Sequence, residues 1–112
     1  MNSTVIIQGA QYYMPIQFFV GETEITNSNC DDIKIKLNHT ELKASTGDLV
    51  YSSYTLLGKT FSGWLFPLTQ SMTLACRTGE VPCQAQIKIG DSIIPTPIVQ
   101  IKIDMTIIPE EW

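Results

Sequence analysis

The sequence predicts an all-β fold, namely a single antiparallel β-sandwich, immunoglobulin-like or jelly-roll-like, with about seven to eight short strands. Three observations lead to this prediction. Apolar and polar residues alternate with a period of two along much of the chain, helical periodicity is nearly absent, and turn residues recur at intervals of roughly ten. The length of 112 residues is typical of one domain, so we expect residues 1–112 to form a single domain.

The clearest strands are predicted over segments 32–38, 83–89 and 99–107. In the first segment, Ile33, Ile35 and Leu37 share one face, while Lys34 and Lys36 share the other. Because successive side chains of a strand face opposite sides of the sheet, this pattern is typical of a half-buried strand. Antiparallel pairing is favoured because the sequence leaves no room for crossover helices.

Turn residues between apolar segments predict two hairpins and one further turn. Gly58-Lys59 separates segments 48–57 and 61–68, and Gly90-Asp91 joins segment 83–89 to Ile93-Ile94. Gly21-Glu22 leads from segment 14–20 into segment 23–26, and segment 4–8 is a further short β-branched run. The first hairpin is rich in aromatic residues, which we expect to supply much of the apolar bulk: Tyr51, Tyr54, Phe61, Trp64 and Phe66.

Prolines and one capping residue indicate where strands are interrupted and where a helical turn begins. Pro15 has no amide donor, so its strand starts there or lies at an edge. Pro95 and Pro97 interrupt a β segment, which predicts either an edge kink or a strand that changes sheet. At most one short helical turn is expected, near Thr69–Ala75, with Thr69 as its N-cap.

The charge pattern argues against two classes of partner. The chain has seven Lys and Arg residues, with no cluster in the sequence, and a net charge of -4. Because nucleic-acid and anionic-membrane binding rely on basic residues, we expect neither partner. No segment approaches the ~18 apolar residues of a membrane span. Residues 1–9 lack the charged start and apolar run of a signal peptide, so we expect a protein made in a cytoplasm.

The residues that could support catalysis or metal binding have unfavourable contexts. His39 is the one histidine, and it follows a predicted strand in a polar stretch without a nucleophile motif, which favours a solvated turn over a catalytic triad. Cys76 and Cys83 are too far apart in the sequence for a typical zinc ligand pair. Cys83 lies on the apolar face of a predicted strand, which is typical of a buried structural thiol. A Cys76–Cys83 disulfide remains geometrically possible, although a reducing compartment disfavours it. Whether Cys30, Cys76 and Cys83 are free stays open. We expect no enzyme, no metal and no cofactor.

Two further binding sites are weighed against simpler interpretations. Asp31-Asp32, after Asn27-Ser28-Asn29, resembles an oxygen-rich calcium loop, but it lacks the regular ligand spacing, so a solvated turn is favoured. Exposed aromatic rings would suit a sugar-binding platform, whereas buried rings would belong to the core. The candidates for such a platform are Tyr12, Tyr13, Tyr51, Tyr54, Trp64 and Trp112.

A stretch in the second half of the chain carries a family resemblance. Residues 64–74 read Trp-Leu-Phe-Pro-Leu-Thr-Gln-Ser-Met-Thr-Leu, followed by Gly79-Glu80-Val81 and by Gln-Ala-Gln-Ile-Lys-Ile at 84–89. Together with Gly-Asp-Leu-Val-Tyr at 47–51, this resembles small virion proteins of phages and prophages of Gram-positive bacteria, which share an aromatic-Pro-Leu-Thr-Gln-x-x-Thr motif. The match covers roughly residues 47–107. The chain departs from the pattern at Gln86, where Arg is usual, and at Pro95-Thr96-Pro97.

The resemblance implies a non-enzymatic phage structural or assembly protein that acts through protein–protein contacts in a baseplate, tail or head. Its expected partners are further copies of itself and other virion proteins, and its expected location is the virion. The alternative is a glycan-binding or host-surface adhesion module on the same fold. We expect contacts at Phe19, Pro95, Pro97 and Trp112, which are apolar groups on polar or edge faces. Trp112 either packs back on a sheet or docks a partner.

Overall fold

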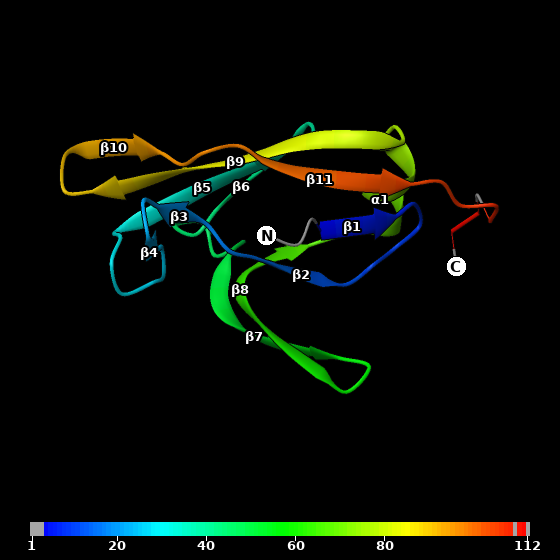
Figure 1. The fold of residues 1–112 in the computed structure, drawn as a ribbon, viewed down its shortest axis with the longest axis horizontal. Helices are drawn as coiled ribbons and strands as arrows, with labels where there is room; N and C mark the ends of the chain where they lie inside the picture. Colours follow the sequence, from blue (N-terminus) through cyan, green and yellow to red (C-terminus); the bar gives the residue numbers. More distant parts are fainter. Residues whose placement is uncertain (1–3, 109, 112) are drawn as a thin grey trace.

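The computed structural model describes residues 4–108, 110 and 111, and it places them in two β-sheets that face each other across a common core (Figure 1). The larger sheet has the order β1 (Thr4–Ile7), β11 (Val99–Asp104), β9 (Gly79–Ile89), β5 (Asp32–Leu37) and β6 (Thr40–Lys43), with β10 (Ser92–Pro95) also paired to β9. The smaller sheet has the order β2 (Tyr13–Ile16), β8 (Lys59–Pro67) and β7 (Val50–Leu56). A separate two-stranded ribbon consists of β3 (Phe19–Val20) and β4 (Thr23–Glu24). The predicted all-β sandwich is confirmed.

The core is formed by the inward-facing side chains of the two sheets. The larger sheet supplies alternate residues of its strands, as the sequence pattern predicts: Ile33, Ile35, Leu37, Val81, Cys83, Ala85, Ile87, Ile101 and Ile103. The smaller sheet contributes Met14, Ile16, Trp64 and Phe66. Phe61, by contrast, is 45% exposed, so this aromatic residue of the hairpin was wrongly expected to add to the core.

One short helix, α1 (Gln70–Ala75), packs at the end of the sandwich, as the sequence predicts. The Thr69 side chain accepts a hydrogen bond from the Met72 backbone amide at 3.2 Å, which is the expected N-cap. The buried Thr73 hydroxyl accepts from the Gly9 backbone amide at 3.0 Å and donates to the Ala10 carbonyl at 2.9 Å. These bonds hold α1 against the loop between β1 and β2.

The expectation of wholly antiparallel pairing is wrong at one place. Strand β1 pairs with β11 in parallel, with Thr4 opposite Ile101 and Ile7 opposite Asp104. A parallel neighbour needs a long connection, usually a helix. Here β1 and β11 are the first and last strands, so the remainder of the sandwich is the connection and no crossover helix is required.

The predicted hairpins are present, but the described residues contain eleven strands rather than seven to eight. Segment 14–20 is divided into β2 and β3, and the prolines divide β10 from β11. Strand β6 was missed because its four residues have no strong apolar alternation. It follows a tight turn at Asn38-His39, in which Asn38 has a φ of 57°, a conformation that Asn tolerates better than most residues.

Pro95, Thr96 and Pro97 form an edge kink, one of the two alternatives the sequence left open. Both β10 and β11 pair with β9, so the chain does not change sheet. Pro95 lies opposite Gln86 and Val99 opposite Cys83, which leaves three residues facing two and defines a β-bulge. Pro15 lies in β2, an edge strand of the smaller sheet, as its missing donor predicts.

Candidate functional site

An apolar groove of about 300 Å³ lies between β1, β2 and the hairpin of β7 and β8. We call it the tyrosine groove, and its lining residues are Val5, Tyr12, Met14, Pro15, Tyr54, Leu56 and Phe61. Figure 1 shows the hairpin extending away from β1 and the larger sheet. Hydrocarbon and ring carbons dominate this lining, so the groove suits an apolar side chain or the face of a sugar ring.

Tyr12 and Tyr54, from two distant segments, line this groove, and Tyr54 also contacts Tyr13. The rings of Tyr13 and Tyr54 pack edge to face, with centroids 5.8 Å apart. Burial, and then the neighbouring Tyr54, raise the pKa of the Tyr12 phenol above its ordinary value. The Tyr12 hydroxyl group is a hydrogen-bond donor and acceptor beside apolar surface.

Only one end of the β7–β8 hairpin, which carries Tyr54, packs against the rest of the sandwich, and the other end projects from it. Near the sandwich, Trp64 on β8 is buried, whereas most residues of β7 are exposed. Paired hydroxyl groups stabilise the projecting part, because Thr55 and Thr60 lie 3.0 Å apart across the strands. At its tip, Leu57 has a φ of 52° and is 95% exposed.

Two of the aromatic residues considered for a sugar platform have structural contacts instead. The Trp64 indole nitrogen donates a hydrogen bond of 2.9 Å to the Ile25 carbonyl, and its ring packs edge to face against Tyr51 at 5.5 Å. The Tyr51 hydroxyl donates to a Glu24 carboxylate oxygen at 2.6 Å, and this bond raises the pKa of Tyr51. Both rings therefore join the β3–β4 ribbon to the smaller sheet.

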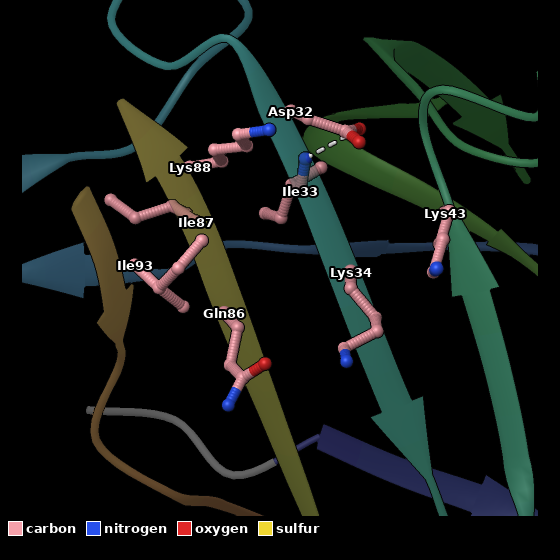
Figure 2. A pocket seen from close by; sticks show the side chains of 8 residues that line it. All are labelled: Asp32, Ile33, Lys34, Lys43, Gln86, Ile87, Lys88 and Ile93. Carbon is pink, nitrogen blue, oxygen red and sulfur yellow. Dashed lines mark hydrogen bonds between the residues drawn. The ribbon is translucent and has the colours of Figure 1, made fainter. Parts of the chain in front are cut away.

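A second, basic pocket of about 150 Å³ opens on the outward face of the larger sheet (Figure 2). Its lining residues are Asp32, Ile33, Lys34, Lys43, Gln86, Ile87, Lys88 and Ile93. The Asp32 Oδ1 atom accepts hydrogen bonds of 2.9 Å from the backbone amides of Ile33 and Ser45. Partial burial by itself raises the pKa of Asp32, but bonds from Ser45 and Ile33, with the charge of Lys43, lower it below the ordinary value.

The residues predicted to make contacts are dispersed over the surface. Phe19 is 41% exposed on the β3–β4 ribbon. Pro95 and Pro97 are exposed on either side of the buried Thr96, at the bulge between β10 and β11. These positions thus belong to two separate elements, and Trp112 lies outside the described residues.

His39 lies in an exposed turn and Cys83 is buried, as the sequence predicts. His39 is exposed in the turn between β5 and β6. The thiols of Cys30, Cys76 and Cys83 are free, and burial raises the pKa of Cys83 to about 12. Among the described residues, no group of three or more His, Cys, Asp or Glu side chains is arranged to hold a metal ion.

The acidic loop considered for calcium is held by backbone amides. Asp31 Oδ2 accepts from the Gly90 amide at 2.7 Å, and Asn29 Oδ1 accepts from the Thr26 amide at 2.8 Å. The Asp31 bond joins the loop to the neighbouring β9–β10 turn, the Asn29 bond closes the loop on itself, and the Asp32 bonds join it to β5 and to Ser45. This is the turn interpretation that the irregular ligand spacing favoured.

Sequence reasoning missed much of the exposed apolar surface. Val5 and Ile7 of β1 are 45% and 56% exposed, and Met105, Ile107 and Ile108, after β11, are 72%, 91% and 66% exposed. The β-branched run in β1 was visible in the sequence, but it predicted a strand without predicting an edge. The alternation of segment 99–107 suggested that its last residues belong to a strand, yet β11 ends at Asp104.

Comparison with protein families, with curated proteins and with solved structures found no match to this chain. The part of the chain that the structure describes has no helix with the length and apolarity required to span a bilayer.

Proposed function

We propose that this protein is a non-enzymatic structural or assembly component of a phage particle, in a baseplate, tail or head, and that it acts through protein–protein contacts. The resemblance of residues 47–107 to small virion proteins suggests the setting. The exposed edge of β1 is the structural observation that supports the mode of action.

Strand β1 has an open, apolar edge. The Gln8 backbone amide donates to the Asp104 carbonyl at 3.0 Å, so the alternation of strand backbone directs the amides of Val5 and Ile7 away from β11. No described strand pairs with that side of β1. An unpaired edge recruits further strands unless charges or prolines protect it.

The opposite edge of the larger sheet has such protection, and β1 does not. Strand β6 carries Glu41 and Lys43, whereas β1 reads Thr-Val-Ile-Ile. The open edge also borders the tyrosine groove, because Val5 lines it. A strand added at β1 therefore extends the sheet and places its side chains beside apolar surface, which is the recognition mode known as β-augmentation.

Incorporation into particles tests this proposal. The protein is expected in purified phage particles by mass spectrometry, and Ile7→Lys is expected to prevent its incorporation while circular dichroism stays unchanged. Thr23→Lys, a like change on the exposed β4, serves as the matched control. Absence of the wild-type protein from particles contradicts the proposed function, and normal incorporation of Ile7→Lys contradicts the role of the β1 edge.

A second candidate function, a glycan-binding module, is favoured by the tyrosine groove alone. Tyr12, Tyr54 and Phe61 line the groove with aromatic rings and phenol hydroxyl groups, a combination that suits a sugar ring. A glycan array is expected to give hits that Tyr54→Ala abolishes, whereas Tyr51→Phe keeps them because its ring packs on Trp64. An array without hits for the wild-type protein removes this candidate.

A further inference from the structure

The basic pocket gathers positive charge in an acidic protein. Lys34, Lys43 and Lys88 line it, although the chain has a net charge of -4. The carboxylate of Asp32 also lies in the lining, where it accepts hydrogen bonds from two backbone amides and lies opposite Lys88 across the strands. Of these three lysines, Lys34 forms an ion pair with Glu41, in which the Nζ and Oε1 atoms lie 3.8 Å apart. Figure 2 shows the lysine side chains on neighbouring strands around the same opening.

The strand register places two of these lysines directly opposite each other. Lys34 on β5 is the partner of Lys43 on β6. Like charges at opposed positions of an antiparallel pair are destabilising, and the neighbouring carboxylates offset only part of this repulsion, since Glu41 pairs with Lys34 and Asp32 lies opposite Lys88. A bound anion between the two side chains relieves the repulsion. Ile93, 58% exposed at the rim of the pocket, adds an apolar contact beside the charges.

The segment after β11 has the complementary chemistry. Its apolar residues Ile107 and Ile108 are exposed, and so are the carboxylates of Glu110 and Glu111. Thr106 anchors the start of the segment, because its backbone amide donates to the Gln8 side chain at 3.3 Å. We call the described residues Met105–Ile108, Glu110 and Glu111 the acidic segment.

The fold holds the pocket and the acidic segment far apart within one chain. Strand β9 pairs with β10 through residues 86–89 and with β11 through residues 79–83. The pocket lies at the end of β9 that pairs with β10, and the acidic segment follows β11 at the other end of β9. About 30 Å of strand therefore separates the pocket from the acidic segment. Figure 1 shows the β9–β10 hairpin and the end of β11 at opposite ends of the long axis.

We infer that the acidic segment of one copy docks in the basic pocket of a second copy, with Glu110 and Glu111 beside Lys34 and Lys43. Each copy then offers one segment and one pocket. Such a head-to-tail contact closes into a ring or continues as a filament. This inference rests on the proposed function and names copies of this chain as the partner.

Charge exchange on the full chain tests the contact. One variant, E110K/E111K, places lysines in the acidic segment, and a second, K34E/K43E, places carboxylates in the pocket. Each variant alone has like charges at both halves of the contact, so it is expected to be monomeric. Mixed, the two variants have opposite charges at every junction and are expected to associate. Lys59→Glu with Arg77→Glu, at exposed positions outside the pocket, changes the net charge as K34E/K43E does and serves as its control.

Sedimentation velocity measures the association. The wild-type mass is expected to rise above that of a monomer between about 10 µM and about 1 mM, with at least a tenfold weaker association for either variant. Raising the salt to about 1 M, where the Debye length is about 3 Å, is expected to weaken the wild-type contact as well. The control variant associates as the wild type does.

Three results overturn the inference. They are a wild-type protein that stays monomeric over the whole range, variants that associate as the wild type does, and a mixture that stays monomeric. Binding of polyphosphate at β5 and β9, seen as amide shifts in a monomeric wild type, assigns the pocket to a free anion instead. The proposed function survives each of these results if particles contain the protein, so the two failures are distinguishable.

Discussion

The hydroxyl group of Thr96 replaces a missing backbone partner at the bulge between β10 and β11. The Ala85 amide donates to Thr96 Oγ1 at 3.1 Å, and the Thr96 amide donates to the Ala85 carbonyl at 2.8 Å. Thr96 is 2% exposed and Ala85 is fully buried. Pro95 and Pro97 have no amide hydrogen, so the proline-flanked bulge cannot form a regular ladder there.

Replacing Thr96 with Val removes this hydroxyl group at nearly constant volume. The Ala85 amide is then buried without a partner, which costs about 1–3 kcal/mol. The added methyl group offsets about 0.8 kcal/mol of this loss. We therefore expect Thr96→Val to lower the free energy of unfolding by about 0.2–2.2 kcal/mol. With an m value of about 1.5 kcal/mol/M, the middle of this range corresponds to a fall of about 0.8 M in the urea midpoint.

Urea denaturation and amide hydrogen exchange together check this prediction. Thr96→Val is expected to lower the midpoint and to reduce the protection of the Ala85 amide. Thr96→Ser keeps the hydroxyl group and is expected to retain that protection, and Thr23→Val, at an exposed position, controls for the intrinsic effect of Val in a strand. A Thr96→Val protein as stable as the wild type, with Ala85 still protected, refutes the reasoning.

Three further changes have defined outcomes. Gly63→Ala is expected to cost about 1–3 kcal/mol of unfolding free energy, since its Cβ would lie 2.8 Å from the Ile16 carbonyl oxygen. Thr69→Ala is expected to cost about 0.5–2 kcal/mol, because it removes the bond to the Met72 amide at the start of α1. Burial raises the pKa of Cys83 to about 12 from 9.0, so the unfolded chain binds fewer protons above pH 9 and stability falls as the pH rises toward 12, by about 1.4 kcal/mol per pH unit for this group.

Matched variants separate these effects from general perturbation. Ser52→Ala, at the exposed position opposite Gly63, and Thr78→Ala, at an exposed position after α1, are expected to change the urea midpoint little. A Gly63→Ala or Thr69→Ala midpoint equal to that of its control contradicts the corresponding contact. For the thiol, Cys83→Ala is expected to show a smaller loss of stability between pH 9 and pH 11 than the wild type, and equal slopes exclude the thiol as the cause.

The sequence by itself determined the local structure, because local structure follows from alternation, turn chemistry and capping. The period-two pattern of segments 32–38 and 83–89 required one buried face on each strand, and the structure has that face. Gly58 and Gly90 marked two hairpins, and Thr69 marked the start of α1. The buried thiol of Cys83 was predictable for the same reason, since it lies on an apolar strand face.

Only the tertiary structure decided which surfaces face outward together. The parallel pairing of β1 and β11, and therefore the open edge of β1, depends on contacts between residues almost a whole chain length apart. The tyrosine groove joins residues 12 and 54, and the basic pocket joins lysines at positions 34, 43 and 88 that form no cluster in the sequence. Local patterns carry no information about such pairings, because strand order and register are set by the joint packing of both sheets on one core.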